Sequence, residues 1–110
     1  MTDPLVFADL LNGGWRSYAF EHFREGIEIC WLKAGEPEVA LLHYQPSASA
    51  PEHRHGGLET IIVLEGSQRD QHGVYPAGTV VLNPEETKHW VASDDGCVVL
   101  IQWVKPVEFL

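Results

Sequence analysis

Short runs rich in β-branched and aromatic residues, divided by clusters of Gly, Pro and acidic residues, constrain the fold of this sequence more than any other feature. Six such runs follow Trp15, namely IEICWL, VALLHYQ, TIIVLEG, VVLN, HWVAS and CVVLIQWV. Runs of this length and composition predict β-strands. The segments that divide them are too short for the helical crossovers that parallel strands need, so we expect an antiparallel sheet. These dividers are residues 33–37, 46–51, 68–73, 84–88 and 93–96.

Residues 98–104 are apolar at both odd and even positions. This pattern predicts a strand covered on both faces, by a second sheet on one side and by a partner subunit on the other. A small all-β sandwich or barrel follows. Only residues 4–11 fit a helix, with Thr2 or Asp3 as its cap and Pro4 in its first turn. We therefore expect one domain over residues 1–110, with a short helical segment in residues 1–14.

Length and charge exclude several classes of protein. The chain has 110 residues, 45% of them hydrophobic, which suits one globular domain. Its net charge of -9 disfavours nucleic acid and anionic membrane surfaces as partners. The first residues carry an acid where a signal peptide needs positive charge, and no apolar stretch is long enough to span a bilayer, so we expect a cytoplasmic protein. Cys30 and Cys97 lack the spacing of a disulfide framework or zinc site and are expected to be reduced thiols.

Histidine and glutamate residues in the middle of the chain form a pattern with metal-binding chemistry. On a strand, His53 and His55 point to the same face, and Glu59 keeps that parity if no bulge intervenes. Imidazole and carboxylate groups together suit Zn, Fe, Mn, Ni and Cu. A fourth ligand must come from another strand, and His89 is the best candidate. The sequence therefore predicts a metal site formed by these four residues.

Two motifs in the chain resemble those of the cupin superfamily. The first is H-R-H-x3-E-x6-G over residues 53–66, and the second is G-x5-P-x-E-x2-H over residues 78–89. The second motif has Glu86 where the family usually has Gly and Ser93 where it usually has Asn. A positive φ at Glu86 would therefore cost free energy. The resemblance implies a single antiparallel cupin β-barrel, also called a double-stranded β-helix or jelly roll, with one divalent metal ion inside and a homodimeric assembly.

The stretch from His53 to Trp90 is similar to one branch of cupins, the cupin domain of ChrR-type anti-sigma factors. The His-x3-Cys-x2-Cys zinc motif of the anti-sigma domain does not occur in the sequence, so no anti-sigma role is expected. The same pattern also resembles small cupin dioxygenases, in which two His, a Glu and a further His hold a non-haem metal. Fe(II) or Zn is expected, with Mn or Ni as further candidates.

Three functions remain open at this point. The first is a metal-dependent enzyme, such as a dioxygenase that acts on a small organic molecule. The second is a ChrR-like zinc module that senses a ligand or an oxidant without catalysis. In the third, the metal only stabilises the barrel. The sequence shows no Ser nucleophile elbow and no Gly-rich phosphate loop, so covalent hydrolysis and nucleotide binding are unsupported.

Residues outside the motifs supply weaker candidates. His43 could donate or accept a proton in the pocket, although a histidine hydrogen-bonded in the barrel wall is the preferred interpretation. Ile62 and Leu64 have the parity opposite to Glu59 and could be buried in a homodimer. Four further residues could line the pocket for a small-molecule ligand or substrate, although core packing is the more common role: Tyr75, Trp90, Gln102 and Trp103.

Overall fold

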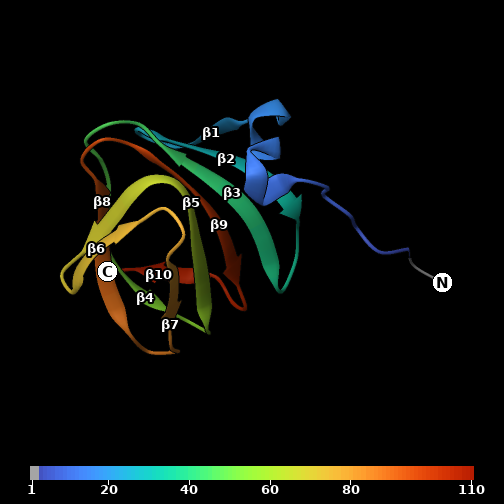
Figure 1. Ribbon diagram of the computed structural model, residues 1–110. Helices are drawn as coiled ribbons and strands as arrows, with labels where there is room; N and C mark the ends of the chain where they lie inside the picture. Colours follow the sequence, from blue (N-terminus) through green and yellow to red (C-terminus); the bar gives the residue numbers. More distant parts are fainter. Residues whose placement is uncertain (1–2) are drawn as a thin grey trace.

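Ten β-strands build the protein in a computed structural model that describes residues 3–110 (Figure 1). All strand pairs are antiparallel, which confirms the expected all-β antiparallel architecture. In chain order the strands are β1 (Glu21–Arg24), β2 (Ile27–Lys33), β3 (Glu38–Tyr44), β4 (Ala48–His55), β5 (Glu59–Asp70), β6 (Gly73–Pro76), β7 (Val80–Asn83), β8 (Lys88–Ser93), β9 (Cys97–Trp103) and β10 (Val107–Phe109).

Strand β5 joins the two halves of the curved sheet. The strand order is β1-β2-β3-β9-β5-β8-β4-β10, and β6 and β7 also pair with β5. The first part of β5 pairs with β9 and β7, whereas its last residues pair with β6 and β8. The two halves therefore curl toward one another and enclose a common interior (Figure 1).

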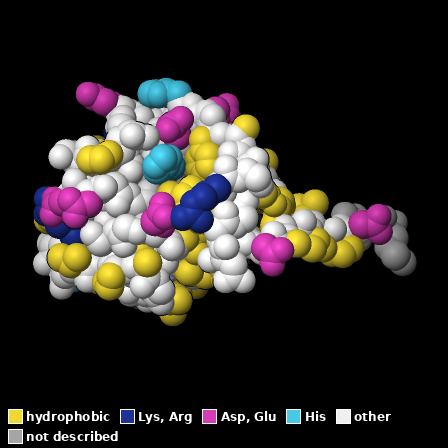
Figure 2. Space-filling model, turned by 45° about the horizontal axis from the view of Figure 1, so that its top comes forward, with side chains coloured by type: hydrophobic (Ala, Val, Ile, Leu, Met, Phe, Trp, Pro, Cys, Tyr) yellow, Lys and Arg dark blue, Asp and Glu magenta, His cyan; other side chains and the backbone are white. Residues whose placement is uncertain are grey.

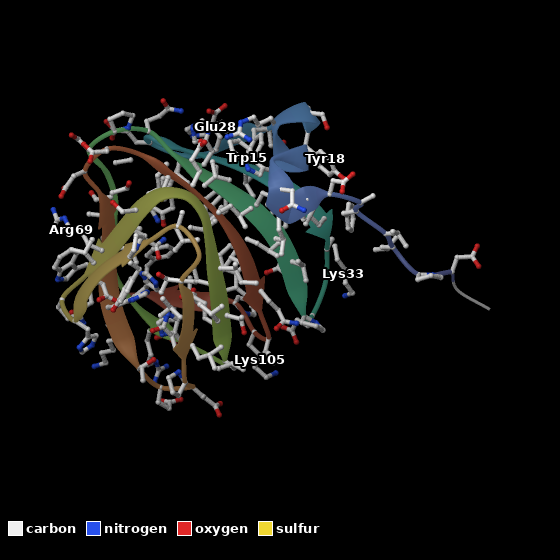
Figure 3. All side chains as sticks on the ribbon, in the orientation of Figure 1. Trp15, Tyr18, Glu28, Lys33, Arg69 and Lys105 are labelled. Atoms are coloured by element: carbon white, nitrogen blue, oxygen red, sulfur yellow. The ribbon has the colours of Figure 1, made fainter. Side chains whose placement is uncertain are left out.

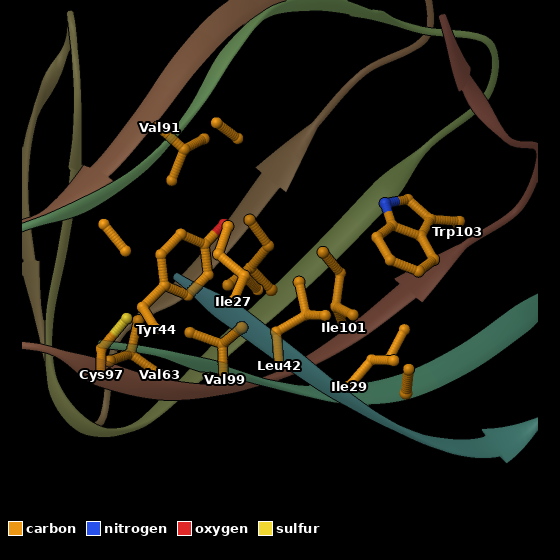
Figure 4. Close-up of a cluster of buried hydrophobic side chains, with 14 residues drawn as sticks. Ile27, Ile29, Leu42, Tyr44, Val63, Val91, Cys97, Val99, Ile101 and Trp103 are labelled. Atoms are coloured by element: carbon orange, nitrogen blue, oxygen red, sulfur yellow. The ribbon is translucent and has the colours of Figure 1, made fainter. Parts of the chain in front are cut away.

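The hydrophobic core fills this interior (Figure 4). It forms because alternate residues of each strand point inward, as in the buried, half-buried, buried pattern of β5. Burial of each large aliphatic side chain contributes about 1.5–3 kcal/mol. The core comprises Ile27, Ile29, Ala40, Leu42, Tyr44, Ala48, Ala50, Ile61, Val63, Val91, Cys97, Val99, Ile101 and Trp103.

The outer face of β3 and β9 is covered by the chain's own N-terminal segment. Leu10 and Trp15 pack against Leu41 and Val98 in a second buried cluster, and Trp15 and Tyr18 can be seen over this face in Figure 3. Both faces of β9 are thus covered, as its composition predicts. At Val98, the outer cover is this segment and not a partner subunit.

The α-helix expected over residues 4–11 is wrong. The segment instead contains two short 3-10 helices, η1 (Leu10–Asn12), which overlaps only the end of that range, and η2 (Gly14–Ser17). Asp9 and Gly13 have left-handed backbone conformations that end any helix there, and Leu5 and Val6 are exposed, so no packed apolar face supports a helix. Figure 2 shows this segment projecting from the barrel with apolar side chains along it. Thr2, an expected cap, lies outside the described residues.

Two of the predicted loops are mostly strand, whereas each of the other three loses only an end residue to a strand. β4 begins at Ala48 inside the divider 46–51, and β5 continues to Asp70 inside the divider 68–73. The ASAPEHRH sequence of β4 has little β-propensity, and the strand forms because it pairs with β8 and β10. Within residues 3–110, no helix is long and apolar enough to cross a membrane.

Candidate metal centre

Three strands bring the predicted metal ligands together. His53 and His55 lie on β4, and His53 is directly opposite His89 of β8 in the antiparallel register. Residues 56–58 leave the strand conformation, and Glu59 is the first residue of β5. The condition for a common parity, that no irregularity intervenes between His55 and Glu59, is therefore not met. The curl of the sheet, and not strand parity, places the Glu59 carboxylate beside the two histidines.

The four side chains form one compact buried cluster. One ligand atom from each of His53, His55, Glu59 and His89 lies within 4.8 Å of those of the others. No member is more than 5% exposed. The His53 and His55 ring centroids each lie 4.6 Å from that of His89. Such a cluster of imidazoles and a carboxylate is the kind of donor set that binds divalent transition metals.

Each imidazole has its Nδ1 atom against an acceptor. His53 Nδ1 lies 2.9 Å from the Pro51 carbonyl oxygen, and His89 Nδ1 lies 3.0 Å from Asp70 Oδ2. His55 Nδ1 lies 2.9 Å from Thr87 Oγ1, whose own proton is donated to the carbonyl of Pro84. All three Nδ1 atoms therefore carry a proton, and in the neutral rings each Nε2 has a free lone pair. This is the tautomer that metal-binding histidines need.

The remaining ring nitrogens fit a cation at the centre. His55 Nε2 lies 3.1 Å from Glu59 Oε1, and both are acceptors when the ring is neutral, so a proton or a metal cation must lie between them. His89 Nε2 is buried, has no hydrogen-bond partner and lies 3.7 Å from the same oxygen. A buried polar atom without a partner is costly. The residues therefore fit a divalent metal ion.

Glu59 is held as a carboxylate by its neighbours. Asn83 Nδ2 donates to Oε1 at 3.0 Å, and Trp103 Nε1 donates to Oε2 at 2.8 Å. Burial raises the pKa of Glu59, but contacts with His55, His89 and Trp103 outweigh it and lower this pKa below its usual value. Burial is the main reason why the pKa of His53 is lowered. An ionised carboxylate and a neutral imidazole are the forms that bind metals.

Asp70 supports His89 from outside the cluster. Its Oδ2 accepts from His89, while its Oδ1 accepts from the Tyr75 hydroxyl and the His72 amide, both at 2.8 Å. Burial raises the pKa of Asp70, but these hydrogen bonds outweigh it and lower this pKa. Sequence reasoning missed Asp70, since the polar tract around it is typical of a surface turn. Asn83 and Thr87 were missed too, although both lie within the second motif.

The turn over residues 84–87 fixes the backbone of His55. Glu86 has a φ of 74°, the left-handed conformation for which glycine is favoured at this motif position. In this conformation its amide donates to the His55 carbonyl, and the His55 amide donates to the Thr87 carbonyl. A non-glycine residue therefore takes a left-handed conformation at this position, the case for which the sequence predicts a cost in free energy.

A cavity of about 50 Å³ adjoins the cluster. His53, Glu59 and His89 form one polar wall, Arg24 and Gln68 are further polar lining residues, and the rest of the lining is largely apolar. This volume holds a few water molecules or a small organic group. The apolar lining includes Ile27, Leu42, Ala50, Ile61, Val91 and Ile101.

The weaker candidates divide between the two faces of the barrel. Trp103 lines the cavity, whereas Tyr75 is not in the cavity wall and is linked to His89 only through Asp70. His43 faces outward, with its ring 5.9 Å from that of Phe20 and Nδ1 3.8 Å from Glu28, and it is not part of the cavity wall. Two further residues are not part of the cavity wall: Trp90, which packs under Arg69, and Gln102.

The curled antiparallel barrel and the buried His/His/Glu/His cluster together define the protein as a cupin. Residues 14–105 match the family model of the ChrR Cupin-like domain, and the chain belongs to this family. The anti-sigma-E factor ChrR of Cereibacter sphaeroides is 28% identical over 109 residues, which cover 96% of this chain and 51% of that protein. This chain thus spans about half the length of that curated relative.

Two solved structures show the same fold. The crystal structure of Rhodobacter sphaeroides SigE in complex with the anti-sigma ChrR matches with a TM-score of 0.77 at 25% identity, covering 87% of this chain and 55% of that chain. An acetylacetone dioxygenase from Acinetobacter johnsonii matches with a TM-score of 0.77 at 15% identity, covering 83% of this chain and 71% of that chain. The second likeness concerns the fold alone.

Proposed function

We propose that His53, His55, Glu59 and His89 bind one divalent metal ion per chain and that the protein is a metal-dependent enzyme for a small organic molecule. The observation that carries this proposal is the cavity, because three of the four cluster residues form its wall. A metal held there would be open to a ligand that enters the barrel. A structural metal site is instead usually closed by its protein ligands.

The chain's own residues would bind the metal ion, orient the substrate beside it and shield both from solvent. A bound divalent ion would supply Lewis-acid activation of a chelating substrate, and Fe(II) would in addition supply dioxygen chemistry. Glu59 offsets one positive charge, and Asn83 and Trp103 keep its carboxylate in place. A substrate that fills this largely apolar cavity would displace its water, which would strengthen the electrostatic interactions inside.

A dioxygenase is the reaction type that we favour, with Fe(II) as the metal. Support comes from the shared fold of the acetylacetone dioxygenase and from the largely apolar lining of the cavity. The test is oxygen consumption by the Fe(II)-restored protein with β-diketones, acidic enols and catechols. We expect turnover of at least one class, lost in the His89→Ala variant. If the protein binds iron but is inactive with every compound of this panel, the proposal that it is a dioxygenase is contradicted.

A zinc-binding sensor module is the second candidate. Membership of the ChrR cupin-like family favours it. In this case Zn fills the cluster, and a small ligand or an oxidant in the cavity changes the surface that the domain presents to a partner. Stoichiometric Zn, with no turnover but with ligand-dependent changes in amide hydrogen exchange, would support the sensor over the enzyme.

We further propose a homodimer in the reducing environment of the cytoplasm. Val80 and Leu82 of β7 expose large apolar side chains, and Ile62 of the paired strand β5 lies on the same outer face. A second copy that covers this face would remove these side chains from water. The free thiols of Cys30 and Cys97 support the reducing compartment.

A further inference from the structure

A β-bulge in β1 directs two neighbouring side chains into the metal cavity. His22 pairs with Glu28 and Arg24 pairs with Ile27, so Phe23 has no partner in the ladder. Neighbouring residues in a regular strand point to opposite faces, yet Phe23 and Arg24 both line the cavity. Bulges re-aim side chains in this way and are common beside functional sites.

Arg24 brings an unpaired positive charge to the cavity. Its guanidinium lies 4.5 Å from the centroid of the Phe109 ring, which in turn lies 5.5 Å from the ring of His53. Each of the other three arginines pairs with an acidic side chain, but no carboxylate in residues 3–110 lies within 4.0 Å of Arg24. In a chain with 16 acidic and seven basic residues, this leaves a free cation beside the cluster.

Aromatic rings form the wall next to Arg24. Phe23 stacks on Trp103 with ring centroids 6.3 Å apart and an interplanar angle of 23°, and Trp31 lies 6.2 Å from Trp103. Phe23 and Trp31 are 38% and 39% exposed. They line an outer groove of about 150 Å³ that shares Phe23, Trp103 and Val107 with the metal cavity. A flat apolar molecule could therefore contact rings in the groove and at the cavity.

We propose that Arg24 binds the anionic oxygens of a small planar organic acid or enolate, whose apolar body packs against Phe23 and Trp103. This inference rests on the proposed metal centre and names the substrate class for it. Glu59 and the Asp70 carboxylate behind His89 together offset the charge of a divalent metal, so Arg24 is the positive charge left to meet an anion at the cavity. Charge-assisted hydrogen bonds from a guanidinium would then select an anion over a neutral molecule of the same shape.

The test compares matched acids and amides. Benzoate against benzamide, and butyrate against butyramide, are titrated into the full chain by calorimetry, with and without bound Zn(II). The variants are Arg24→Gln, Arg24→Lys and the control Arg16→Gln. This control removes the same charge from an exposed pair with Glu65, remote from the cavity. Zinc content is measured for every protein.

We expect the wild type to bind at least one acid about tenfold or more tightly than its amide. Arg24→Gln should lose this preference with its zinc content unchanged, Arg24→Lys should keep part of it, and Arg16→Gln should behave as the wild type. Equal affinity for acid and amide, no binding of either acid, or an unchanged preference in Arg24→Gln would each overturn the role of Arg24. A wild type without zinc affinity would refute the metal centre, and the metal-free titrations would still decide the role of Arg24.

Discussion

Replacement of Asp70 by Asn should weaken metal binding although Asp70 is outside the cluster. In the variant, the side-chain oxygen can still accept from Tyr75 and the His72 amide, which leaves the NH2 group facing His89 Nδ1. His89 must then accept at Nδ1 and carry its proton on Nε2, the atom that we propose binds the metal. Loss of such a support typically costs about 10- to 100-fold in metal affinity, or roughly 1.4–2.7 kcal/mol.

The assay is a Zn(II) competition titration against a chromophoric chelator at neutral pH. The control is Asp94→Asn, which removes the same charge from an exposed residue that pairs with Arg69. We expect the control to match the wild type within about twofold, a difference well below the expected loss. Circular dichroism checks that both variants are folded. An Asp70→Asn affinity equal to that of the control would refute the role of Asp70 in orienting His89.

Three further predictions concern the fold and assembly. Gly66→Ala should lower the free energy of unfolding, measured by urea titration, by at least about 2 kcal/mol. The reason is that Gly66 has a φ of 74° and an added Cβ would collide with the Gly96 carbonyl. A change below about 0.5 kcal/mol would contradict this prediction. Glu86→Gly should change the free energy of unfolding by less than about 1 kcal/mol, because relief of the left-handed backbone strain offsets the larger conformational entropy of the unfolded chain. A loss of stability as large as that expected for Gly66→Ala would be inconsistent with this balance. Sedimentation should find a dimer at micromolar concentration that Leu82→Lys weakens, and a monomeric wild type would refute the homodimer.

The strands that the sequence predicts are those in which local preference and burial agree. Runs such as TIIVLEG and CVVLIQWV are β-branched and buried, and they form β5 and β9. β4 lacks this agreement, since its Ala, Ser and Pro residues favour a loop, and Pro51 lies where the register with β8 shifts. Only its tertiary pairing makes it a strand. The α-helix predicted for the N-terminal segment was wrong for a related reason. Packing of Leu10 and Trp15 on β3 and β9 determines the conformation of this segment, and local helix signals do not.

The members of the buried His/His/Glu/His cluster were predictable from the sequence, but the way in which the fold assembles them was not. The spacing of the two motifs identifies four residues that the fold brings within ligand distance of one another. The alternation of side chains along a strand did not predict that the chain leaves the strand conformation over residues 56–58, before Glu59. The acceptor for His89 is Asp70, and that for His55 is Thr87. Each acceptor lies far from its histidine in the sequence, and only the curl of the barrel brings the two together. Arg24 could not be found either, since it faces the cavity through a bulge that no local signal marks.

Metal content tests the central claim most directly. The chain is purified without tags or chelators and analysed by elemental mass spectrometry beside a His53→Ala, His89→Ala double variant, with circular dichroism to show that the variant is folded. We predict close to one divalent metal ion per chain in the wild type and none in the folded variant. A metal-free wild type, or a folded variant that keeps the same metal content, would contradict the proposed metal centre.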